Sequence, residues 1–432
     1  MDALFSFSSK VVLYAGAFCT SIFAALVLEP EQQGYFFTFL SLAAAYVFVE
    51  LGLSSAVINF CGHEVVEIRK SVSVERVQRA KARLVGFGRL VIGWFMAGGV
   101  VFGVALIGVG LVLFAGEGAS TSAPLLPWLA LCFVLMLDVA LLAFFFLMEG
   151  LNEVRTVYAY RTLKALILNG VMWLALFQGY GLWAVSIGYA ATLPVSLYYI
   201  LVVKRDLFQQ FKSPVAGSPI SWKKEVLPFQ WRIAVSWMCG YVTSWSITPL
   251  TLVMYGAEAA GRVGFTWSIA MGVIAISNSV ILFKAPQMSQ LVAERNFALL
   301  DRVALKYGGA SVILAALGGS GVLALTAILN LFGFDFAERM LSIEVAAYLF
   351  IGIAVLQVTQ PMAVYLRAHK REPFLVVSIG FSILFILLVV GLRGMMGLTS
   401  ITLAYLLTCL FFVLPVGSFI FFRCRRRWHA SV

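Results

Sequence analysis

The sequence predicts an all-α polytopic membrane protein of about twelve transmembrane helices, arranged as two parallel repeats of six helices. Three observations predict this class. Of the 432 residues, 62% are hydrophobic and only 12% are charged, about half the charged share of roughly 25% that soluble domains carry. The apolar residues gather in long runs that are separated by short charged loops. Three short motifs also occur twice, in the same order.

Twelve apolar runs account for most of the chain, and each is long enough to span a bilayer, which takes about 20 apolar residues in a helix. The second run contains a single charge, Glu50. A carboxylate at that depth costs roughly 2.5–3.5 kcal/mol, so we expect Glu50 to face protein or water. The predicted spans are Phe5–Leu28, Gly34–Phe60, Leu84–Ala115, Leu125–Met148, Val157–Gln178, Gly181–Val203, Pro228–Tyr255, Gly261–Lys284, Tyr307–Leu331, Ile343–Leu366, Pro373–Leu392 and Gly397–Phe422.

The basic residues predict the orientation. All but three of the 31 Lys and Arg residues fall on one side of these spans, the exceptions being Arg262, Arg339 and Arg393. Because the basic side stays in the cytoplasm, we expect both termini there. The net charge of +11 is spread over short loops, so it does not indicate nucleic-acid binding. The outer loops are acidic and carry Glu29, Glu31, Glu117, Glu258, Asp335 and Glu338.

The same pattern argues against an enzyme or a metalloprotein. The six cysteines show neither a disulfide framework nor metal-ligand spacing, and the three histidines fall in loops or in the tail. No outer loop is long enough to hold a catalytic domain. No signal-peptide cleavage site is evident. We therefore expect no catalytic residue, no metal site and no cofactor.

The internal repeats predict a tandem duplication. The motif Glu31-Gln-Gln-Gly34 recurs as Glu258-Ala-Ala-Gly261. Val74–Val77 matches Leu300–Val303, and Gly181–Tyr189 matches Gly397–Tyr405. Because six spans is an even number, both halves keep one orientation and are related by an axis along the membrane normal. The predicted division is an N-terminal lobe at 1–203, a cytoplasmic linker at 204–227, a C-terminal lobe at 228–422 and a basic cytoplasmic tail at 423–432.

The inner loop from Cys61 to Arg83 has its own character. Apolar residues recur in it at helical spacing between charged residues. This pattern predicts an amphipathic helix lying at the membrane interface and leading into the third span.

Four stretches of the chain carry a resemblance to a known family. They are Glu31–Tyr35 followed by Glu50–Leu53; Met148–Leu151 followed by Arg155 and Arg161; Gly179–Ala184; and Leu227–Phe229 with Arg232. Together they resemble the Wzx-type polysaccharide flippases of the multidrug/oligosaccharidyl-lipid/polysaccharide exporter superfamily. The chain departs from that family at Lys284, where relatives usually carry an aromatic residue.

This resemblance implies two six-helix lobes that face each other across a central cavity and work by alternating access. It implies export of an undecaprenyl-pyrophosphate-linked oligosaccharide from the inner to the outer leaflet of a bacterial inner membrane, for O-antigen, capsule or exopolysaccharide biosynthesis. Membrane lipids and other polysaccharide-assembly membrane proteins are the partners that it implies.

A pyrophosphate needs fixed cations, and sugars need polar and aromatic side chains. The candidate residues for the cavity are Arg232, Ser236, Tyr241 and Trp245 on the seventh span, Lys10 on the first, Arg161 and Lys164 on the fifth, and Lys284. Lys10 and Arg232 occupy equivalent inner ends of the two halves. The alternative role of these basic residues is to anchor the spans at the inner headgroups.

Asp138 and Glu50 lie within spans and are candidates for coupling to H+ or Na+. The alternative is a structural ion pair. For Gln357 and Gln360, which precede Pro361 on the tenth span, we favour a role in supporting a proline kink over sugar binding.

Two other functions compete with the flippase. A multidrug or cation antiporter of the same superfamily needs an acidic and aromatic cavity, whereas inward-placed basic residues favour an anionic cargo. An O-antigen polymerase or ligase needs a long outer loop with catalytic Arg or His, which the sequence lacks.

Overall fold

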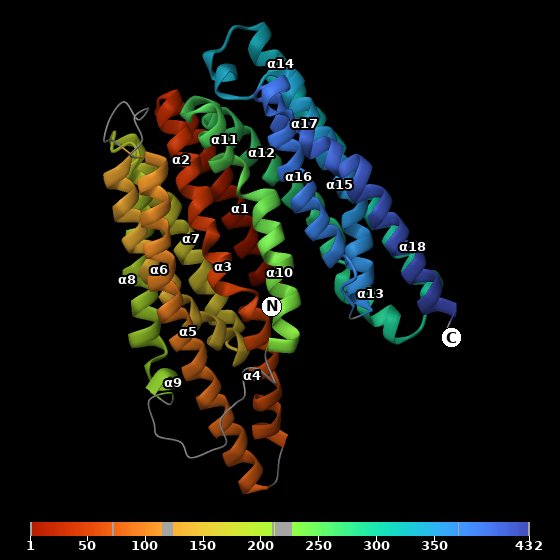
Figure 1. Cartoon of the computed structure of the whole chain (residues 1–432). Helices are drawn as coiled ribbons and strands as arrows, with labels where there is room; N and C mark the ends of the chain where they lie inside the picture. Colours follow the sequence, from red (N-terminus) through yellow and green to blue (C-terminus); the bar gives the residue numbers. More distant parts are fainter. Residues whose placement is uncertain are drawn as a thin grey trace. The chain divides into compact units, whose positions relative to one another are not determined.

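The computed structural model describes residues 2–70, 73–114, 124–209, 211, 227–369 and 371–430, and every regular element within these ranges is helical. The predicted all-α fold class is therefore confirmed. Within these ranges, eight helices are long and apolar enough to cross a membrane, and the bent pair 30–50 and 53–70 adds a ninth. The remaining three predicted spans correspond to α1, α7 and the broken helix formed by α10 and α11 (Figure 1).

The chain divides into two compact units. Unit 1 comprises Met1–Leu28 and Phe39–Met238, and unit 2 comprises Glu29–Thr38 and Cys239–Val432. The first turns of α2 thus belong with the second half of the chain. The predicted lobe boundaries at 203 and 228 stay a prediction, and most of the predicted linker, 212–226, lies outside the described residues.

Unit 1 holds the helices of the first half of the chain. They are α1 (Asp2–Val27), α2 (Pro30–Ala43) from Phe39 onward, η1 (Ala44–Tyr46), α3 (Val47–Glu50), α4 (Leu53–Lys70), α5 (Val74–Phe114), α6 (Leu125–Gly150), α7 (Val154–Phe177), α8 (Trp183–Tyr198), η2 (Tyr199–Val203), α9 (Arg205–Gln209) and the start of α10 (Leu227–Ser244). A break at Leu51 and Gly52, both with positive φ, separates α3 from α4.

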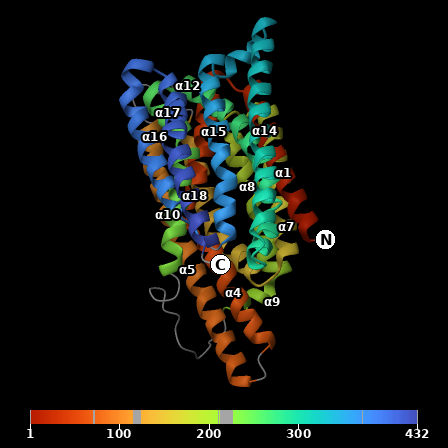
Figure 2. The same cartoon turned by 90° about the vertical axis from the view of Figure 1, so that its right-hand side faces the viewer.

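Unit 2 holds the second half. Its helices are the rest of α10, α11 (Ile247–Tyr255), α12 (Ala257–Leu282), α13 (Ala285–Ala293), α14 (Phe297–Leu331), η5 (Asp335–Arg339), α15 (Ile343–Ala368), α16 (Leu375–Met396), α17 (Thr399–Thr408), η6 (Cys409–Val413) and α18 (Leu414–Ala430) (Figures 1 and 2).

The two halves share one scheme of helix packing, which supports the predicted duplication. In unit 1, α6 packs against α4, α5 and α8, and α7 packs against α8. In unit 2, α15 packs in the same way against α12, α14 and α17, and α16 packs against α17. Each element of the first set is the counterpart, in chain order, of an element of the second.

The segment Cys61–Arg83 differs from its prediction. It is not a separate interfacial helix, because α4 continues to Lys70 and α5 begins at Val74 and runs for 41 residues. At 1.5 Å per residue, α5 is about 60 Å long, twice the hydrocarbon thickness of about 30 Å. The charged turns are therefore extensions of two spans, and Arg83 and Glu64 pair across them at 2.9 Å.

The repeated glycine motifs meet each other inside unit 2, where the first turns of α2 cross the start of α12. A Cβ added at Gly34 would lie 1.8 Å from the carbonyl oxygen of Ala257, and one added at Gly261 would lie 2.9 Å from that of Pro30. The motif spacing relates Gly34 to Gly261 and Pro30 to Ala257, so the two contacts are copies of one another. The duplicated motif is thus a self-complementary helix crossing.

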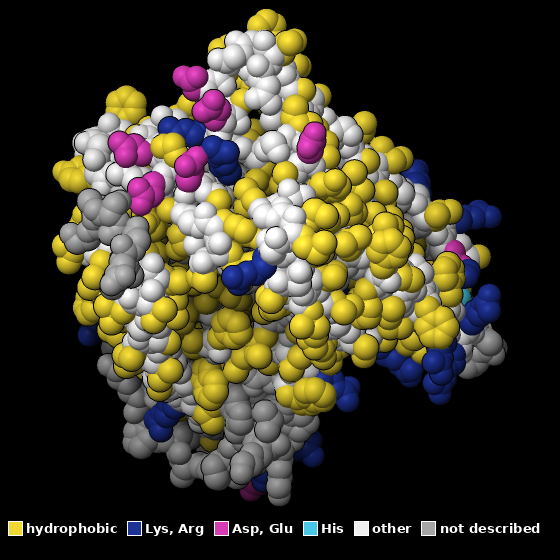
Figure 3. Space-filling view, turned by 45° about the horizontal axis from the view of Figure 1, so that its top comes forward, with side chains coloured by type: hydrophobic (Ala, Val, Ile, Leu, Met, Phe, Trp, Pro, Cys, Tyr) yellow, Lys and Arg dark blue, Asp and Glu magenta, His cyan; other side chains and the backbone are white. Residues whose placement is uncertain are grey.

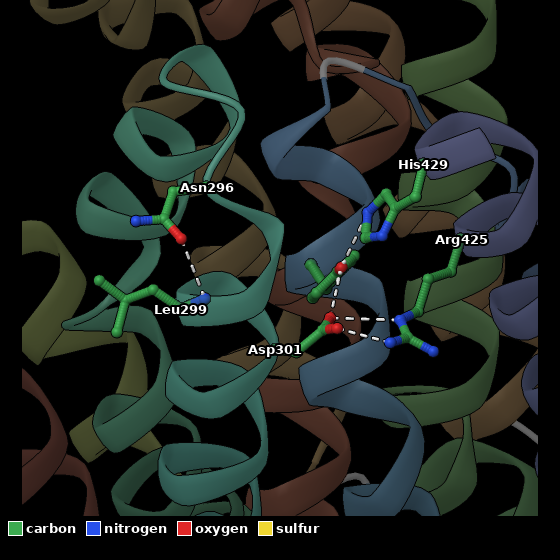
Figure 4. Close-up of polar contacts among 6 residues, drawn as sticks. Asn296, Leu299, Asp301, Arg425 and His429 are labelled. Atoms are coloured by element: carbon green, nitrogen blue, oxygen red, sulfur yellow. Dashed lines mark hydrogen bonds and ion pairs between the residues drawn. The ribbon is translucent and has the colours of Figure 1, made fainter. Parts of the chain in front are cut away.

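At the opposite end of unit 2, α18 is tied to α14 and α15 by polar contacts (Figure 4). Arg425 binds both carboxylate oxygens of Asp301, at 3.2 and 2.5 Å, and the Tyr365 hydroxyl donates to the same carboxylate at 2.7 Å. His429 stacks on Phe297 with ring centroids 4.0 Å apart. Part of the predicted tail is therefore a helix anchored to the bundle.

Candidate functional site

A pair of charges lies between α6 and α7 in the interior of unit 1. The Lys164 ammonium donates to Asp138 Oδ1 at 2.5 Å, and the two side chains are only 18% and 12% exposed. The helical hairpin produces this contact, because Asp138 and Lys164 lie at similar distances in sequence from the turn at 151–153. The fold thus brings together Lys164, predicted to bind the cargo, and Asp138, predicted to couple to an ion.

Three tyrosines surround this pair. The Tyr160 hydroxyl shares a hydrogen bond with Ser196 on α8 at 2.8 Å, and its ring stacks on Phe145 with centroids 3.6 Å apart. Tyr46 and Tyr189 lie within electrostatic range of both Asp138 and Lys164. Sequence reasoning missed the tyrosines, because no spacing along one helix links residues of η1, α7 and α8.

A second pair lies nearer the turn. Arg161 donates to Glu149 at 2.6 Å, and its guanidinium lies over the ring of Tyr158 at 5.4 Å. Glu50 is 3% exposed, hydrogen-bonds Ser54 and lies within electrostatic range of Arg161 and Glu149. The prediction that Glu50 faces protein or water rather than lipid agrees with this burial.

A third pair closes the turn itself. Lys204 binds Glu153 at 2.8 Å, and this hydrogen bond holds the pKa of the Glu153 carboxyl below its usual range. The three pairs form a row of alternating charges along α6, α7 and the end of η2. Glu149 and Glu153 were missed by the sequence analysis, although their positions beside the turn were the available signal.

Neutral polar side chains join α1 to α7 in the same unit. The Thr20 hydroxyl donates to Asn169 Oδ1 at 2.7 Å, and the indole of Trp173 donates to Thr20 at 2.7 Å. Lys10 lies on α1, but its side chain is outside those that the structure describes.

The predicted residues of α10 differ in exposure. Arg232 is exposed and lies over the ring of Trp231 at 5.4 Å, Ser236 is half-buried, and Trp245 is 39% exposed. Tyr241 is buried, at 9% exposure. Arg232 and Ser236 belong to unit 1, whereas Tyr241 and Trp245 belong to unit 2.

Lys284, in unit 2, lies against two rings, with its ammonium 5.3 Å from the centroid of Phe283 and 4.9 Å from that of Tyr307. Among the described residues, no carboxylate forms an ion pair with Lys284 or Arg232. These two cations therefore differ from Arg161 and Lys164, which are neutralised.

The interior of unit 2 contains an uncharged network of hydrogen bonds. Gln357 donates both amide hydrogens, to Asn278 at 2.9 Å and to Ser311 at 2.5 Å. Ser311 in turn donates to the Ser277 carbonyl oxygen at 2.6 Å. The interpretation that Gln357 supports a kink at Pro361 is therefore wrong, because its donors are used by other helices. Within the described ranges, no three acidic, His or Cys side chains are placed to hold a metal ion.

The sequence matches no protein-family model and no curated protein. Solved structures match over nearly the whole chain. An inward-facing multidrug resistance MATE family transporter of the MOP superfamily matches with a TM-score of 0.63 and 15% identity, covering 96% of this chain and 95% of the other. The MATE multidrug transporter DinF-BH matches with a TM-score of 0.57 and 16% identity, covering 96% and 93%.

A Vibrio cholerae MATE transporter matches with a TM-score of 0.56 and 12% identity, covering 97% and 94%. The fold is therefore that of the MATE transporters. At 12–16% identity these matches show the fold alone and do not single out the flippases.

Proposed function

We propose that the protein is an ion-coupled membrane transporter of the MATE type that exports organic cations by alternating access. The observation that carries this proposal is the buried ion pair of Asp138 with Lys164, surrounded by tyrosines. Polar and ionisable residues inside spans are costly and mark ion and substrate pathways. Two of the solved structures with this fold are named as multidrug transporters, which supports the same class of function.

The pairing of charges supports a cationic cargo over an anionic one. Lys164, Arg161 and Lys204 are each neutralised by a carboxylate. A pyrophosphate entering unit 1 would have to compete with those carboxylates, whereas an organic cation would find carboxylates and aromatic faces. The expectation from sequence that unit-1 cations favour an anion is thereby weakened.

The ion pair offers a simple mechanism of coupling. A proton or sodium ion that reaches Asp138 competes with Lys164 for the carboxylate. Neutralised Asp138 leaves the Lys164 ammonium buried without its counter-ion, which costs several kcal/mol. The network must then rearrange, and the ion shifts the balance between two states of the transporter.

The test uses the full-length protein in liposomes, with ethidium as the cationic cargo and the membrane potential clamped. An imposed proton or sodium gradient should drive ethidium transport, and Asp138→Asn should abolish the dependence on the gradient. Asp206→Asn is the matched control, because Asp206 is exposed on α9. Gradient-driven transport by Asp138→Asn would contradict the proposal.

The lipid-linked oligosaccharide flippase is a second candidate, favoured by Arg232 and Lys284, which keep unneutralised charges beside aromatic rings. For an anionic headgroup leaving a bacterial cytoplasm, the potential supplies roughly 2.3 kcal/mol per charge and 100 mV. Potential alone should then drive export of a lipid-linked oligosaccharide, without an ion gradient.

In cells, Arg232→Ala should abolish surface glycan at an unchanged protein level, and Arg232→Lys should restore it in part because Lys lacks the bidentate fork. Arg205→Ala is the control, since Arg205 is exposed on α9. Normal surface glycan in Arg232→Ala cells would exclude this candidate.

A further inference from the structure

A second polar site lies in unit 2, at the end that carries the predicted outer loops. Gln33 on α2, Glu258 and Arg262 on α12, and Asp335, Glu338 and Arg339 on η5 line a cavity of about 160 Å³. Figure 3 shows acidic side chains gathered around basic ones on this face. Nothing in the proposed transport function accounts for this site.

Two buried polar atoms of the cavity lining have no hydrogen-bond partner among the described residues. Gln33 is 1% exposed, and its Oε1 is unpaired, whereas its Nε2 donates to the carbonyl oxygens of Gly261 at 2.9 Å and Arg339 at 3.3 Å. These two bonds fix the orientation of the amide, because a flipped amide would face two carbonyls with its own oxygen. The second unpaired atom is Arg339 Nη1. Leaving a buried polar atom without a hydrogen bond is costly, so each of these two atoms calls for a complementary group.

The charges around these two atoms restrict the kinds of ligand that the cavity can bind. Glu258 and Arg262 neutralise each other at 2.6 Å. Asp335 and Glu338 form no ion pair with any described residue, and Arg339 is the remaining cation. The lining thus presents acceptors with an excess of negative charge, beside one guanidinium donor.

The loop that carries these groups is held in place. The backbone N–H of Leu341 donates to Thr266 on α12 at 3.0 Å, and the Arg339 carbonyl accepts from Gln33. The lining is therefore fixed by contacts that do not involve the unpaired atoms.

We propose that this cavity binds a small primary amine with a neighbouring hydrogen-bond acceptor, such as an ethanolamine group. The ammonium would donate to Gln33 Oε1 and to the carboxylates of Asp335 and Glu338. The hydroxyl or phosphate oxygen next to it would accept from Arg339. The volume equals that of about five water molecules in the liquid, enough for ethanolamine, either free or as a lipid headgroup.

The test titrates the full-length protein, in nanodiscs of phosphatidylcholine, with ethanolamine, ethylamine and choline by calorimetry. Ethanolamine should bind saturably and at least about tenfold more tightly than choline, which has no N–H donor. The double variant Asp335→Asn, Glu338→Gln should bind ethanolamine about tenfold or more weakly than the wild type. Glu294→Gln, an exposed change at the end of α13, should leave binding unchanged.

Arg339→Met separates recognition from folding, since the backbone carbonyl of residue 339 remains for Gln33. This variant should lose the preference for ethanolamine over ethylamine while still binding ethylamine. In phosphatidylethanolamine nanodiscs, a weaker apparent affinity for ethanolamine would identify the lipid headgroup as the ligand, and an unchanged affinity would identify the free amine. Absence of saturable binding, or equal binding of choline, would overturn the proposal. Gln33 Oε1 and Arg339 Nη1 would then be expected to hydrogen-bond to water.

Discussion

At the scale of single residues, the charged side chains within unit 1 act as pairs rather than as individual groups. Asp138 and Lys164 are both largely buried, and a buried ion pair gains little net stability, because desolvation offsets the attraction. Removing one partner is costly, however, since the other charge stays buried. Under the proposed function, this asymmetry would let an ion that arrives at Asp138 control the network.

The asymmetry predicts an order of stabilities. Lys164→Met alone should destabilise the protein by about 3–5 kcal/mol, because Asp138 is left uncompensated. Adding Asp138→Leu should restore most of the loss, since two apolar side chains replace the pair. Apparent melting temperatures in detergent measure this order. A double variant no more stable than Lys164→Met would show that the pair itself holds α6 against α7.

His369 provides a separate prediction about pH. It follows α15, its Nδ1–H donates to the Tyr365 carbonyl oxygen at 3.1 Å, and its ring lies 5.0 Å from that of Trp428. Burial, aided by Arg371, holds the pKa of His369 below its usual range. When folding lowers the pKa of a histidine, the folded protein loses stability as the pH falls below the pKa of that histidine in the unfolded chain, which is about 6.5.

The melting temperature should therefore fall between about pH 7.5 and pH 5.5, and His369→Phe should reduce that fall, because Phe keeps the ring contacts and cannot take up a proton. His63→Phe, on an exposed position of α4, should leave the pH dependence unchanged. An equal fall in wild type and His369→Phe would assign the pH effect to other groups.

At the scale of elements, the crossing of α2 and α12 is set by glycines. Gly→Ala at an open helical position stabilises by about 0.5–1 kcal/mol. Gly309 on α14 has no atom within 4 Å of an added Cβ, whereas at Gly34 the Cβ would meet the Ala257 carbonyl. Gly309→Ala should therefore keep or raise the melting temperature and Gly34→Ala should lower it. A Gly34→Ala protein as stable as Gly309→Ala would show that this crossing adjusts freely.

The helices themselves could be predicted well, because a membrane span is a local property of about 20 consecutive residues. The expected span Leu125–Met148 corresponds to α6, Leu125–Gly150. The partners of the candidate residues could not be predicted, because they depend on contacts between helices. Lys284 was expected to serve a cargo, and only the fold places Tyr307 against it.

At the scale of the whole molecule, the two halves share a packing scheme but not the chemistry of their interiors. The interior of unit 1 holds charged pairs, whereas Gln357, Asn278 and Ser311 form a neutral network in unit 2. The proposed function therefore assigns ion coupling to unit 1, which holds the charged pairs. In both copies of the motif, the glycine makes room for the other helix.

The last prediction concerns the number of spans. Eight or nine helices qualify by length and hydropathy, and α1, α7 and the broken pair α10–α11 must also cross to give twelve. With both termini cytoplasmic, reporter fusions after Gly118 and Gly179 should be outside, following three and five spans. Fusions after Lys212 and Val432 should be inside. If α1 did not cross, Gly118 would lie on the same side as the N-terminus. If α7 did not cross, Gly179 would lie on the opposite side from Gly118. An outside signal at Lys212 or Val432 would therefore refute two parallel repeats of six spans, because an even number of spans must return the chain to the side it left.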